Sequence, residues 1–414
     1  MCGRSRSGGS EGVDVVNRVR IFCAVSLLAM VVAVSGLAGG AVAGAFSSGS
    51  GAPIVVGVIC TCGGPFGTEI IADVDAYKAW VDTVNKSGGL DGHPVKIIYE
   101  NTTATPGKGS AEIKTLLSDH IDALFSFSLT NFTWAKTVQA SGIPVVGGGV
   151  ASTTYEEYSD WYPSGQTQNS AVYAVVQTIK EARAKKFAYF YCTDSAICSH
   201  IIPTIKADGA KAGDPMVYDV SVAPTAPNYD AQCLAAKQSG ATGLYIGDGG
   251  AVVTAIAKSC HTQGYYPVYF TEGGGFSLSE ETAPGLKTDS WAEYTNVPFF
   301  SNNPQVKKMN AAMTKYFPGV RAEKTAWPGY ATTMWASGLL LATAVKHSGM
   351  TASTTPSPKL IVKGLDSLKN DTLDGTSPPL TFKAGQKHQV DCWFVGRIVH
   401  GKATVANSGK AYCE

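Results

Sequence analysis

Residues 54–66 read IVVGVICTCGGPF, and this stretch decides the fold class that we expect. Its β-branched first half is typical of a buried strand, and it ends in a glycine-proline turn at residues 63–65. A long amphipathic helix follows, because apolar residues recur along one face at spacings of four, three, four and three: Ile70, Val74, Tyr77, Val81 and Val84. A strand, a glycine turn and a helix open an α/β domain, and such sheets bind ligands at this kind of turn.

The N-terminus has the three-part pattern of a secretory signal peptide. Four arginines precede an apolar run over residues 21–38, and Ala41-Val42-Ala43 offers a small-residue cleavage site. We therefore expect a signal peptide over residues 1–43 and a Gly/Ser-rich linker over 44–52. An uncleaved anchor is the alternative, because the run is almost long enough to span a bilayer. Cys23 opens the apolar run instead of closing it, so we find no lipobox and expect a soluble, exported chain in the periplasm or cell envelope.

Length and charge exclude some classes of partner. The 414 residues allow two domains with an ample core. Cleavage after residue 43 removes four basic and two acidic residues, so totals of 33 and 32 become 29 and 30, a net charge near −1. Because no basic patch or lysine run occurs, we expect no nucleic-acid partner.

The cysteines indicate disulfides. Without Cys2 and Cys23 the ten cysteines become eight, an even number that favours disulfides in an exported protein. Loop spacing, neighbouring elements and, for the first pair, elimination suggest four bonds: Cys60–Cys62, Cys192–Cys198, Cys233–Cys260 and Cys392–Cys413. A thiolate metal site at the C-x-C sequence is the alternative, but no histidine stands at ligand spacing to it. We expect neither a metal nor a cofactor.

Apolar runs alternate with amphipathic stretches along the chain. Strands are expected at 54–60, 95–99, 122–127, 143–146, 187–191, 216–220, 243–247 and 267–271, with strand-like segments at 379–382 and 390–399. Helices are expected at 66–87, 108–118, 131–141, 168–184, 197–211, 229–238, 250–263, 303–317 and 328–348. This alternation predicts parallel sheets with crossover helices. A polar, aromatic stretch over residues 152–168 interrupts the rhythm, which favours two lobes over one eight-stranded barrel.

Three turns in the first half are candidate ligand sites, each with a purely structural alternative as a turn or helix cap. Glycines let the backbone approach a ligand, and hydroxyls and free N–H groups at helix starts can bind a carboxylate. The candidate residues are Gly64, Pro65 and Phe66 after the first strand, Ser128 and Thr130 after the third, and Gly149, Ala151 and Ser152 after the fourth.

Carboxylates follow the strands of the second half. Asp194, Asp248 and Glu272 each stand at the carboxyl end of an expected strand, where one of them could hold a ligand ammonium. Individually, an acid in this position is more often a cap or a solvated loop acid. Phe299 is a candidate wall residue. Because H-E-x-x-H and paired histidines at metal spacing are missing, and no G-x-S-x-G follows the expected signal peptide, we expect a binding protein and not an enzyme.

Several motifs in order make the chain resemble the type I periplasmic substrate-binding proteins of ABC transporters, especially the branched-chain amino-acid-binding family. The similarity runs from about Pro53 to the C-terminus. It is carried by VGVICTCGGPFG, by VNKSGGLDGHPVKIIYEN after the first helix, by ASGIPVVGGG, and by AQCLAAKQSGATGLYIG followed by SCHTQGYYP. The phrase NKSGGLDGHPV is the most specific of them.

The resemblance implies two doubly wound, Rossmann-like α/β lobes joined by a three-strand hinge, with one ligand between them. Lobe one would comprise residues 53–169 and 276–388, and lobe two 170–275 and 389–414. The family's carboxylate-binding serine aligns with Ser128, and the donors after the fourth strand align with Gly149, Ala151 and Ser152. The family's ammonium-binding glutamate aligns near Val252, so the resemblance leaves open whether the ligand carries an α-amino group.

The resemblance also implies a function. We expect a monomeric solute-binding protein of an ABC importer that captures a small polar ligand and delivers it to a membrane permease. An amino acid such as Leu, Ile or Val is the first candidate, and an amide or small carboxylate is the next. The alternatives are a sensor that presents its closed form to a receptor, and a secreted α/β hydrolase.

Overall fold

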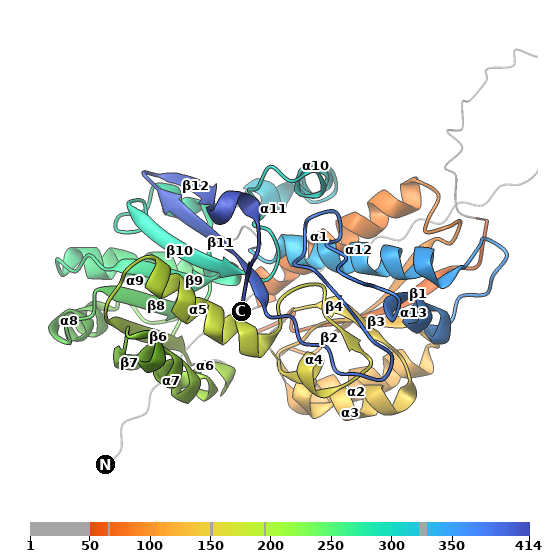
Figure 1. The fold of residues 1–414 in the computed structure, drawn as a ribbon, viewed down its shortest axis with the longest axis horizontal. Helices are drawn as coiled ribbons and strands as arrows, with labels where there is room; N and C mark the ends of the chain where they lie inside the picture. Colours follow the sequence, from red (N-terminus) through yellow and green to blue (C-terminus); the bar gives the residue numbers. More distant parts are fainter. Residues whose placement is uncertain (1–49, 65–66, 104, 150–151, 194–195, 323–328) are drawn as a thin grey trace, which may run out of the picture. The chain divides into compact units, whose positions relative to one another are not determined.

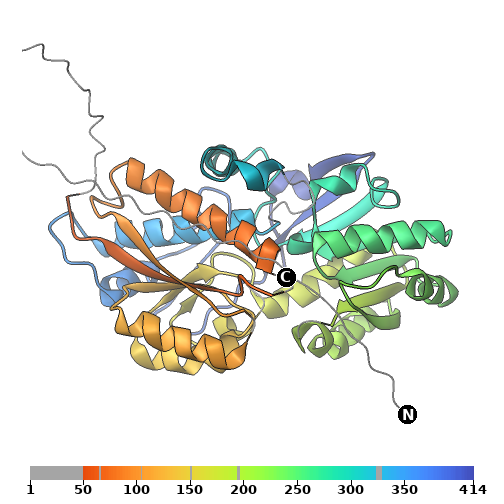
Figure 2. The ribbon, with the colours of Figure 1, turned by 180° about the vertical axis from the view of Figure 1, so that it is seen from behind.

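A computed structural model describes residues 50–64, 67–103, 105–149, 152–193, 196–322 and 329–414. The expected signal peptide and most of the expected linker lie outside these ranges. Within them, two sheets carry the fold, and each is covered by helices on both faces (Figures 1 and 2). No helix in the described ranges combines the length and the apolar character needed to cross a membrane.

The first sheet is parallel and contains, in the described residues, five strands in the order β2-β1-β3-β4-β5. The strands are β1 (Ile54–Cys60), β2 (Val95–Asn101), β3 (Ala123–Phe127), β4 (Val145–Gly148) and β5 (Trp161–Tyr162). Helices α1 (Gly67–Lys86) and α12 (Ala331–Ser348) cover one face, and α2 (Pro106–Ser118) and α3 (Ala135–Ser141) cover the other (Figure 1). The β-branched run of β1 is buried between these layers, as its composition predicts.

The second sheet has the order β12-β11-β10-β9-β8-β6-β7, with β13 paired to β11. Its parallel strands are β6 (Phe187–Cys192), β7 (Met216–Val222), β8 (Gly243–Gly247), β9 (Val268–Glu272) and β10 (Asp289–Tyr294). Its antiparallel strands are β11 (Cys392–Val399), β12 (Lys402–Val405) and β13 (Tyr412–Cys413). The two sheets confirm the predicted pair of α/β lobes.

Helices of the second lobe separate into two layers. Helices α5 (Gln168–Glu181) and α7 (Ile202–Ala212) contribute to the core on one face of the sheet, and α8 (Asp230–Gln238) and α9 (Gly250–Thr262) to the core on the other. The remaining helices are α4 (Thr154–Glu157), α6 (Ala196–His200), α10 (Pro304–Tyr316), α11 (Pro318–Ala322) and α13 (Pro358–Leu365). Short 3₁₀ turns are η1 (Asn131–Thr133), η2 (Gly273–Gly275), η3 (Leu278–Glu281) and η4 (Ala406–Gly409).

Several elements differ from the prediction. Strands β5, β10, β12 and β13 were not expected. Two of them have only two residues, and β10, DSWAEY, is not an apolar run because it contains two acids and a serine. The strand-like segment 379–382 forms only an isolated bridge between Asp371 and Leu380. The helix expected over 197–211 is split into α6 and α7, and Pro203 stands in the first turn of α7.

The lobe boundary expected at residue 276 is also wrong. Strand β10 pairs with β9 and β11, so the chain stays in the second sheet until Tyr294. The chain then crosses to α10, whose Val306 and Met309 share a core with α1 and α12. The physical reason is that β10 completes the parallel row beside β9, a long-range pairing that the local sequence does not signal.

The three segments that join the sheets are hydrogen bonded to one another and buried. The Gln166 N–H donates to the Thr295 carbonyl at 3.3 Å, and the Thr167 N–H donates to the Val390 carbonyl at 3.2 Å. The Asn296 side-chain amide donates to the Ser164 carbonyl at 2.8 Å. The three crossings therefore form one bonded unit, as a hinge requires.

Four disulfides join the described cysteines, and they are the four pairs suggested by the spacing. Cys233–Cys260 ties α8 to α9, and Cys392–Cys413 ties β11 to β13. Cys192–Cys198 joins the end of β6 to α6, and Cys60–Cys62 closes the end of β1. Because both sulfurs of the C-x-C sequence are bonded to each other, they cannot act as thiolate metal ligands.

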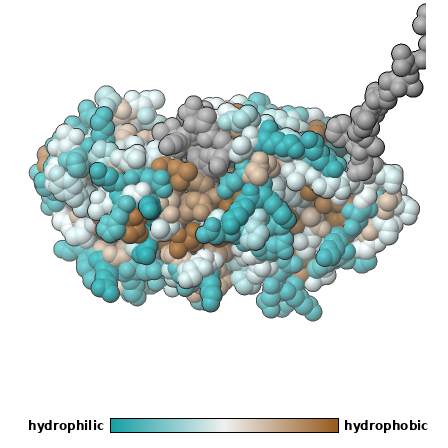
Figure 3. Space-filling view, turned by 90° about the horizontal axis from the view of Figure 1, so that it is seen from above, coloured by the Kyte–Doolittle hydropathy of each residue, from teal (hydrophilic) through white to brown (hydrophobic). Residues whose placement is uncertain are grey.

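The described surface carries few large apolar side chains. Ile71, Tyr99, Phe132, Leu234 and Tyr266 are the exposed ones among the described residues, and they come from separate parts of the sequence. Figure 3 shows one face on which hydrophilic and near-neutral residues cover most of the area and hydrophobic residues gather near the middle. Scattered exposed apolar residues of this kind are ordinary for a globular protein.

A buried acid caps η3 in the second lobe. Ser277 and Glu280 form a capping box, in which the Ser277 N–H donates to Glu280 Oε1 at 2.9 Å. The Ser290 hydroxyl donates to Glu280 Oε2 at 2.9 Å. Burial raises the pKa of Glu280 from 4.5 to about 8, so its carboxyl is protonated at neutral pH.

This raised pKa predicts a pH-dependent stability. Because the folded protein holds the Glu280 proton more tightly than the unfolded chain, its contribution is full below pH 4.5 and is lost as pH rises through about 8. Denaturant unfolding of the wild type should show stability falling across this window, by at most about 1.4 kcal/mol per pH unit. Glu280→Gln should flatten this part of the profile, and an unchanged slope in that variant would contradict the assignment.

Candidate functional site

The candidate residues stand at the carboxyl ends of parallel strands. Thr61, Ser128 and Gly149 follow β1, β3 and β4 of the first sheet. Asp248 follows β8 of the second sheet, and Glu272 is the last residue of β9. In open α/β sheets, ligands bind at this edge, so the geometry of these residues decides what can bind.

The glycine turn after β1 is described only in part. Gly64 is exposed, has a φ of 78° and accepts a hydrogen bond from the Gly67 N–H at 3.0 Å. That bond closes the turn into α1. Pro65 and Phe66 lie outside the described residues, and so do Ala151 after β4 and Asp194 after β6.

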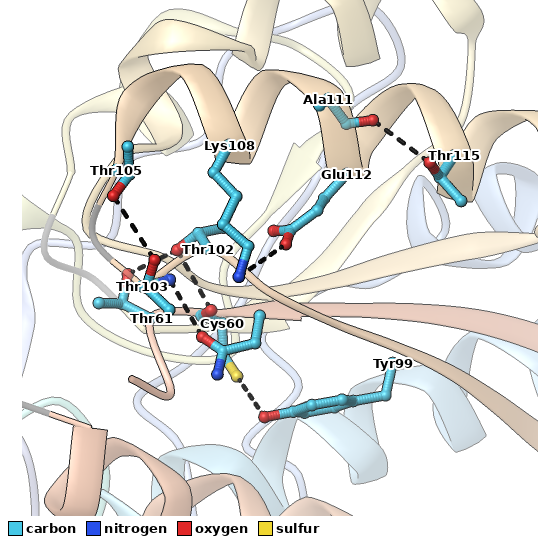
Figure 4. A network of polar contacts seen from close by, with 11 residues as sticks. Cys60, Thr61, Tyr99, Thr102, Thr103, Thr105, Lys108, Ala111, Glu112 and Thr115 are labelled. Carbon is cyan, nitrogen blue, oxygen red and sulfur yellow. Dashed lines mark hydrogen bonds and ion pairs between the residues drawn. The ribbon is translucent and has the colours of Figure 1, made fainter. Parts of the chain in front are cut away.

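Threonine side chains tie the end of β1 to its neighbours (Figure 4). Thr61 is fully buried, and its hydroxyl lies 3.0 Å from that of Thr102, which follows β2. The same Thr61 oxygen accepts the Leu129 N–H at 3.0 Å, and the Thr61 N–H donates to the Phe127 carbonyl at 2.9 Å. Thr61 therefore holds the backbone on both sides of Ser128.

The Cys60–Cys62 disulfide frames this residue. Tyr99 Oη lies 3.1 Å from Cys60 Sγ (Figure 4). Since a disulfide sulfur carries no hydrogen, the tyrosine hydroxyl is the donor. The Thr102 N–H donates to the Cys60 carbonyl at 2.8 Å. Cys60 and Cys62 are both buried, so the disulfide and its partners give Thr61 a rigid setting.

Ser128 and Thr130 form a tight turn after β3. Ser128 is 2% exposed, and its Oγ accepts the Thr130 N–H at 3.2 Å. The two hydroxyl oxygens lie 3.0 Å apart, and either one can be the donor. When Thr130 donates, Ser128 Oγ accepts two bonds and keeps its own hydrogen available for a carboxylate oxygen.

Ser152 repeats this turn with the opposite outcome. Its Oγ accepts the Thr154 N–H at 3.2 Å and donates to the Thr154 hydroxyl at 3.0 Å. The Ser152 hydrogen is therefore already engaged. The hydroxyl hydrogen that this turn leaves available belongs to Thr154, which the sequence did not single out.

The glycine run after β4 serves close packing. Gly148 has a φ of 116°, and a Cβ there would lie 1.8 Å from the Ser126 carbonyl oxygen. Its N–H donates to Ser337 Oγ at 2.8 Å, and the Gly149 N–H donates to the Ser126 carbonyl at 2.9 Å. Both backbone donors are used inside the first lobe, including that of Gly149, which the sequence suggested for a ligand.

In the second lobe, Glu272 is the acid with the most developed surroundings. The Tyr245 hydroxyl donates to its Oε1 at 2.9 Å, and the Tyr330 hydroxyl donates to its Oε2 at 3.1 Å. Burial, followed by the charge of Glu272, raises the pKa of both tyrosines well above their usual range, so both remain hydroxyl donors. Asp248 Oδ1 accepts the Gly249 N–H at 2.8 Å, a contact typical of a turn.

Phe299 lies in the core. It is 2% exposed, and its ring centroid is 5.2 Å from that of Phe300 and 6.3 Å from that of Phe276. Its expected role as a wall of the site has no support in this packing.

Tyr330 lies between Glu272 and the end of β3, and no sequence motif signals this role. Its N–H donates to Asp73 Oδ1 at 2.9 Å, and its hydroxyl reaches Glu272. Its ring meets that of Phe127 edge-on, with centroids 5.9 Å apart, and Phe127 directly precedes Ser128. Tyr330 thus connects the hydroxyl turn after β3 with the carboxylate at the end of β9.

Known proteins share this architecture. The sequence profile of the periplasmic binding protein family matches residues 53–403. A Leu/Ile/Val-binding protein homologue, homolog 3 of Brucella melitensis, is 24% identical over 270 residues, which are 63% of this chain and 72% of the relative.

Solved structures agree on the fold. A fatty acid ABC transporter substrate-binding protein from Thermomonospora curvata has a TM-score of 0.71 at 14% identity, with 87% of this chain and 92% of that chain covered. An ABC transporter solute binding protein from R. palustris, solved in complex with benzoate, has a TM-score of 0.69 at 14% identity, with 87% and 98% covered. The family and these neighbours are solute-binding proteins and not enzymes. Because the family profile spans most of the sequence, this chain belongs to the periplasmic binding protein family.

Proposed function

We propose that this chain captures a small carboxylate ligand between its lobes and delivers it to the membrane permease of an ABC importer. An amino acid such as Leu, Ile or Val is the first candidate, which the similarity to a Leu/Ile/Val-binding homologue supports. Two of the structural neighbours, a fatty acid ABC transporter protein and a solute binding protein in complex with benzoate, are also associated with carboxylates. The protein would act in the periplasm or cell envelope after export, as a monomer.

The observation that carries the proposal is the buried hydroxyl turn at Ser128. A carboxylate placed there would meet one free hydroxyl hydrogen in a nearly dry setting, where a hydrogen bond to a charged group is strong. Thr61 would be a positioning residue, because its side chain holds the Leu129 N–H next to Ser128.

Binding would need no covalent chemistry. The bonded crossings at Ser164–Thr167, Thr295–Asn296 and Val390 would bend as the lobes close on the ligand. The ligand would stabilise the closed form only through its higher affinity for that form.

A thermal-shift screen of residues 44–414 tests the ligand class. Amino acids, small carboxylates, amides, urea and sugars should be compared, and a ligand at 100 times its Kd should add about 2.7 kcal/mol to stability. Carboxylate compounds should raise the melting temperature. A shift with sugars or urea alone would contradict the carboxylate site.

Ser128→Ala should weaken binding of the carboxylate ligand found in the screen by about 1–3 kcal/mol, because the carboxylate loses one charged hydrogen bond. Titration calorimetry gives the two dissociation constants. Ser118→Ala, on the exposed end of α2, is the matched control and should bind like the wild type. Equal affinities for Ser128→Ala and the control would remove the basis of the proposed site.

Thr61→Val should lower affinity by about 1 kcal/mol, because the isosteric side chain no longer accepts the Leu129 N–H. Thr61→Ser keeps the hydroxyl and should restore most of the affinity. The two variants are compared by calorimetry with the same ligand. A loss in Thr61→Ser as large as that in Thr61→Val would show that the methyl packing matters and that the hydroxyl does not.

A further inference from the structure

Two glutamates lie side by side at the carboxyl ends of neighbouring strands of the second sheet. Glu272 ends β9, and Glu293 on β10 is its partner in the strand register. Registered residues of neighbouring parallel strands project from the same face, and the strands lie about 4.8 Å apart. The two carboxyl groups therefore belong to one small volume, with the Tyr245 and Tyr330 hydroxyls on Glu272.

Glu293 is the unusual member of the pair. It is 3% exposed, and its Oε2 has no hydrogen-bond partner in the part of the chain that the structure describes. Burial, followed by the negative charge of Glu272, raises its pKa well above the ordinary value. Two neighbouring carboxylates repel each other when both are charged, and the burial of Glu293 strengthens this repulsion.

The charged groups around the pair are acids. Asp73 and Asp248 raise the pKa of tyrosines in the same cluster, Asp73 that of Tyr330 and Asp248 that of Tyr189. Among the described side chains that act on Glu293, Tyr245, Tyr330 and Tyr189, none is basic.

An arginine stands on the next strand. Arg397 of β11 lies over the Trp291 ring at 5.1 Å, and its charge acts on Asp289. Glu272 and Glu293 therefore form an acidic pole, and none of the described residues that face this pole supplies a positive charge.

Tyr330 links this acidic pole to Phe127 at the end of β3. The Tyr330 hydroxyl contacts Glu272, and the Tyr330 ring contacts Phe127, the residue before Ser128. A ligand carboxylate at Ser128 and a second ligand group at Glu272 would thus lie on opposite sides of one tyrosine.

We propose that Glu272 and Glu293 share one proton in the empty protein, and that a cationic amine of the ligand replaces this proton on binding. The inference rests on the proposed carboxylate site and extends it to ligands that carry both a carboxylate and an amine. The exchange is balanced, because one positive charge enters with the ligand and one proton leaves to solvent. Affinity for such a ligand should rise with pH wherever the pair still holds its proton, by up to about tenfold per pH unit.

The experiment compares matched compounds with and without the amine. L-leucine is paired with 4-methylpentanoate, and L-phenylalanine with 3-phenylpropanoate, in calorimetry at pH 7 in buffers of different ionisation enthalpy. The amine-bearing compounds should bind at least about tenfold more tightly and release about one proton per ligand. Glu293→Gln should abolish the proton release, whereas the control Glu280→Gln, a buried acid of η3 outside the site, should keep it.

A second readout needs no ligand. The infrared band of protonated carboxyl groups at pH 7 should contain a component that Glu293→Gln removes and Glu280→Gln leaves. Absence of that component would overturn the shared proton, whatever the compounds do. Circular dichroism of both variants checks that they fold.

The outcomes separate the two proposals. Equal binding of the deaminated compounds, or binding of the amines without proton release, would overturn the inference and leave the carboxylate site standing. If none of the four compounds binds but other carboxylates stabilise the protein in the screen, the inference about the amine is overturned and the carboxylate site stands. If no carboxylate of any kind binds, the proposed function itself fails.

Discussion

The position of β1 between β2 and β3 in the first sheet is the constraint on which the candidate site depends. Because β1 pairs in parallel with both β2 and β3, the residue that follows it lies between the ends of both neighbours. Thr61 occupies this place and reaches Thr102 on one side and Leu129 on the other. A buried hydroxyl with partners on two strands holds their ends in a set geometry, and the Ser128 turn inherits it.

The arrangement of the two lobes depends on the hinge, the three crossings that join them. Three crossings of the chain meet in buried hydrogen bonds, so a change in one crossing is transmitted to the others. The apolar core continues through this region, since Phe276, Tyr294 and Phe299 belong to the same cluster as α1 and α12. The lobes are therefore joined by packed and bonded structure, and the proposed closure would be a bending of this region.

The two poles of the candidate site differ in their physical character. The first lobe presents neutral hydroxyls held by backbone bonds, a setting that suits an anion. The second lobe presents Glu272, Glu293 and tyrosine hydroxyls, a setting that suits a proton or a cation. Tyr330 contacts Glu272 and the ring of Phe127, and it thereby brings a first-lobe aromatic residue against a second-lobe carboxylate.

The sequence alone predicts the α/β class, the positions of most helices and strands, and the sheet edge at which the candidate residues stand. These features are local, because they follow from periodicity, turn residues and the order of elements. The four cysteine pairs also follow from spacing and from the neighbouring elements. Three features emerge only from the folded chain. Strand β10 belongs to the second sheet, Glu293 lies beside Glu272, and Tyr330 contacts both Glu272 and Phe127. Strand register and contacts between residues far apart in the chain create these relations, and no short window of sequence contains them.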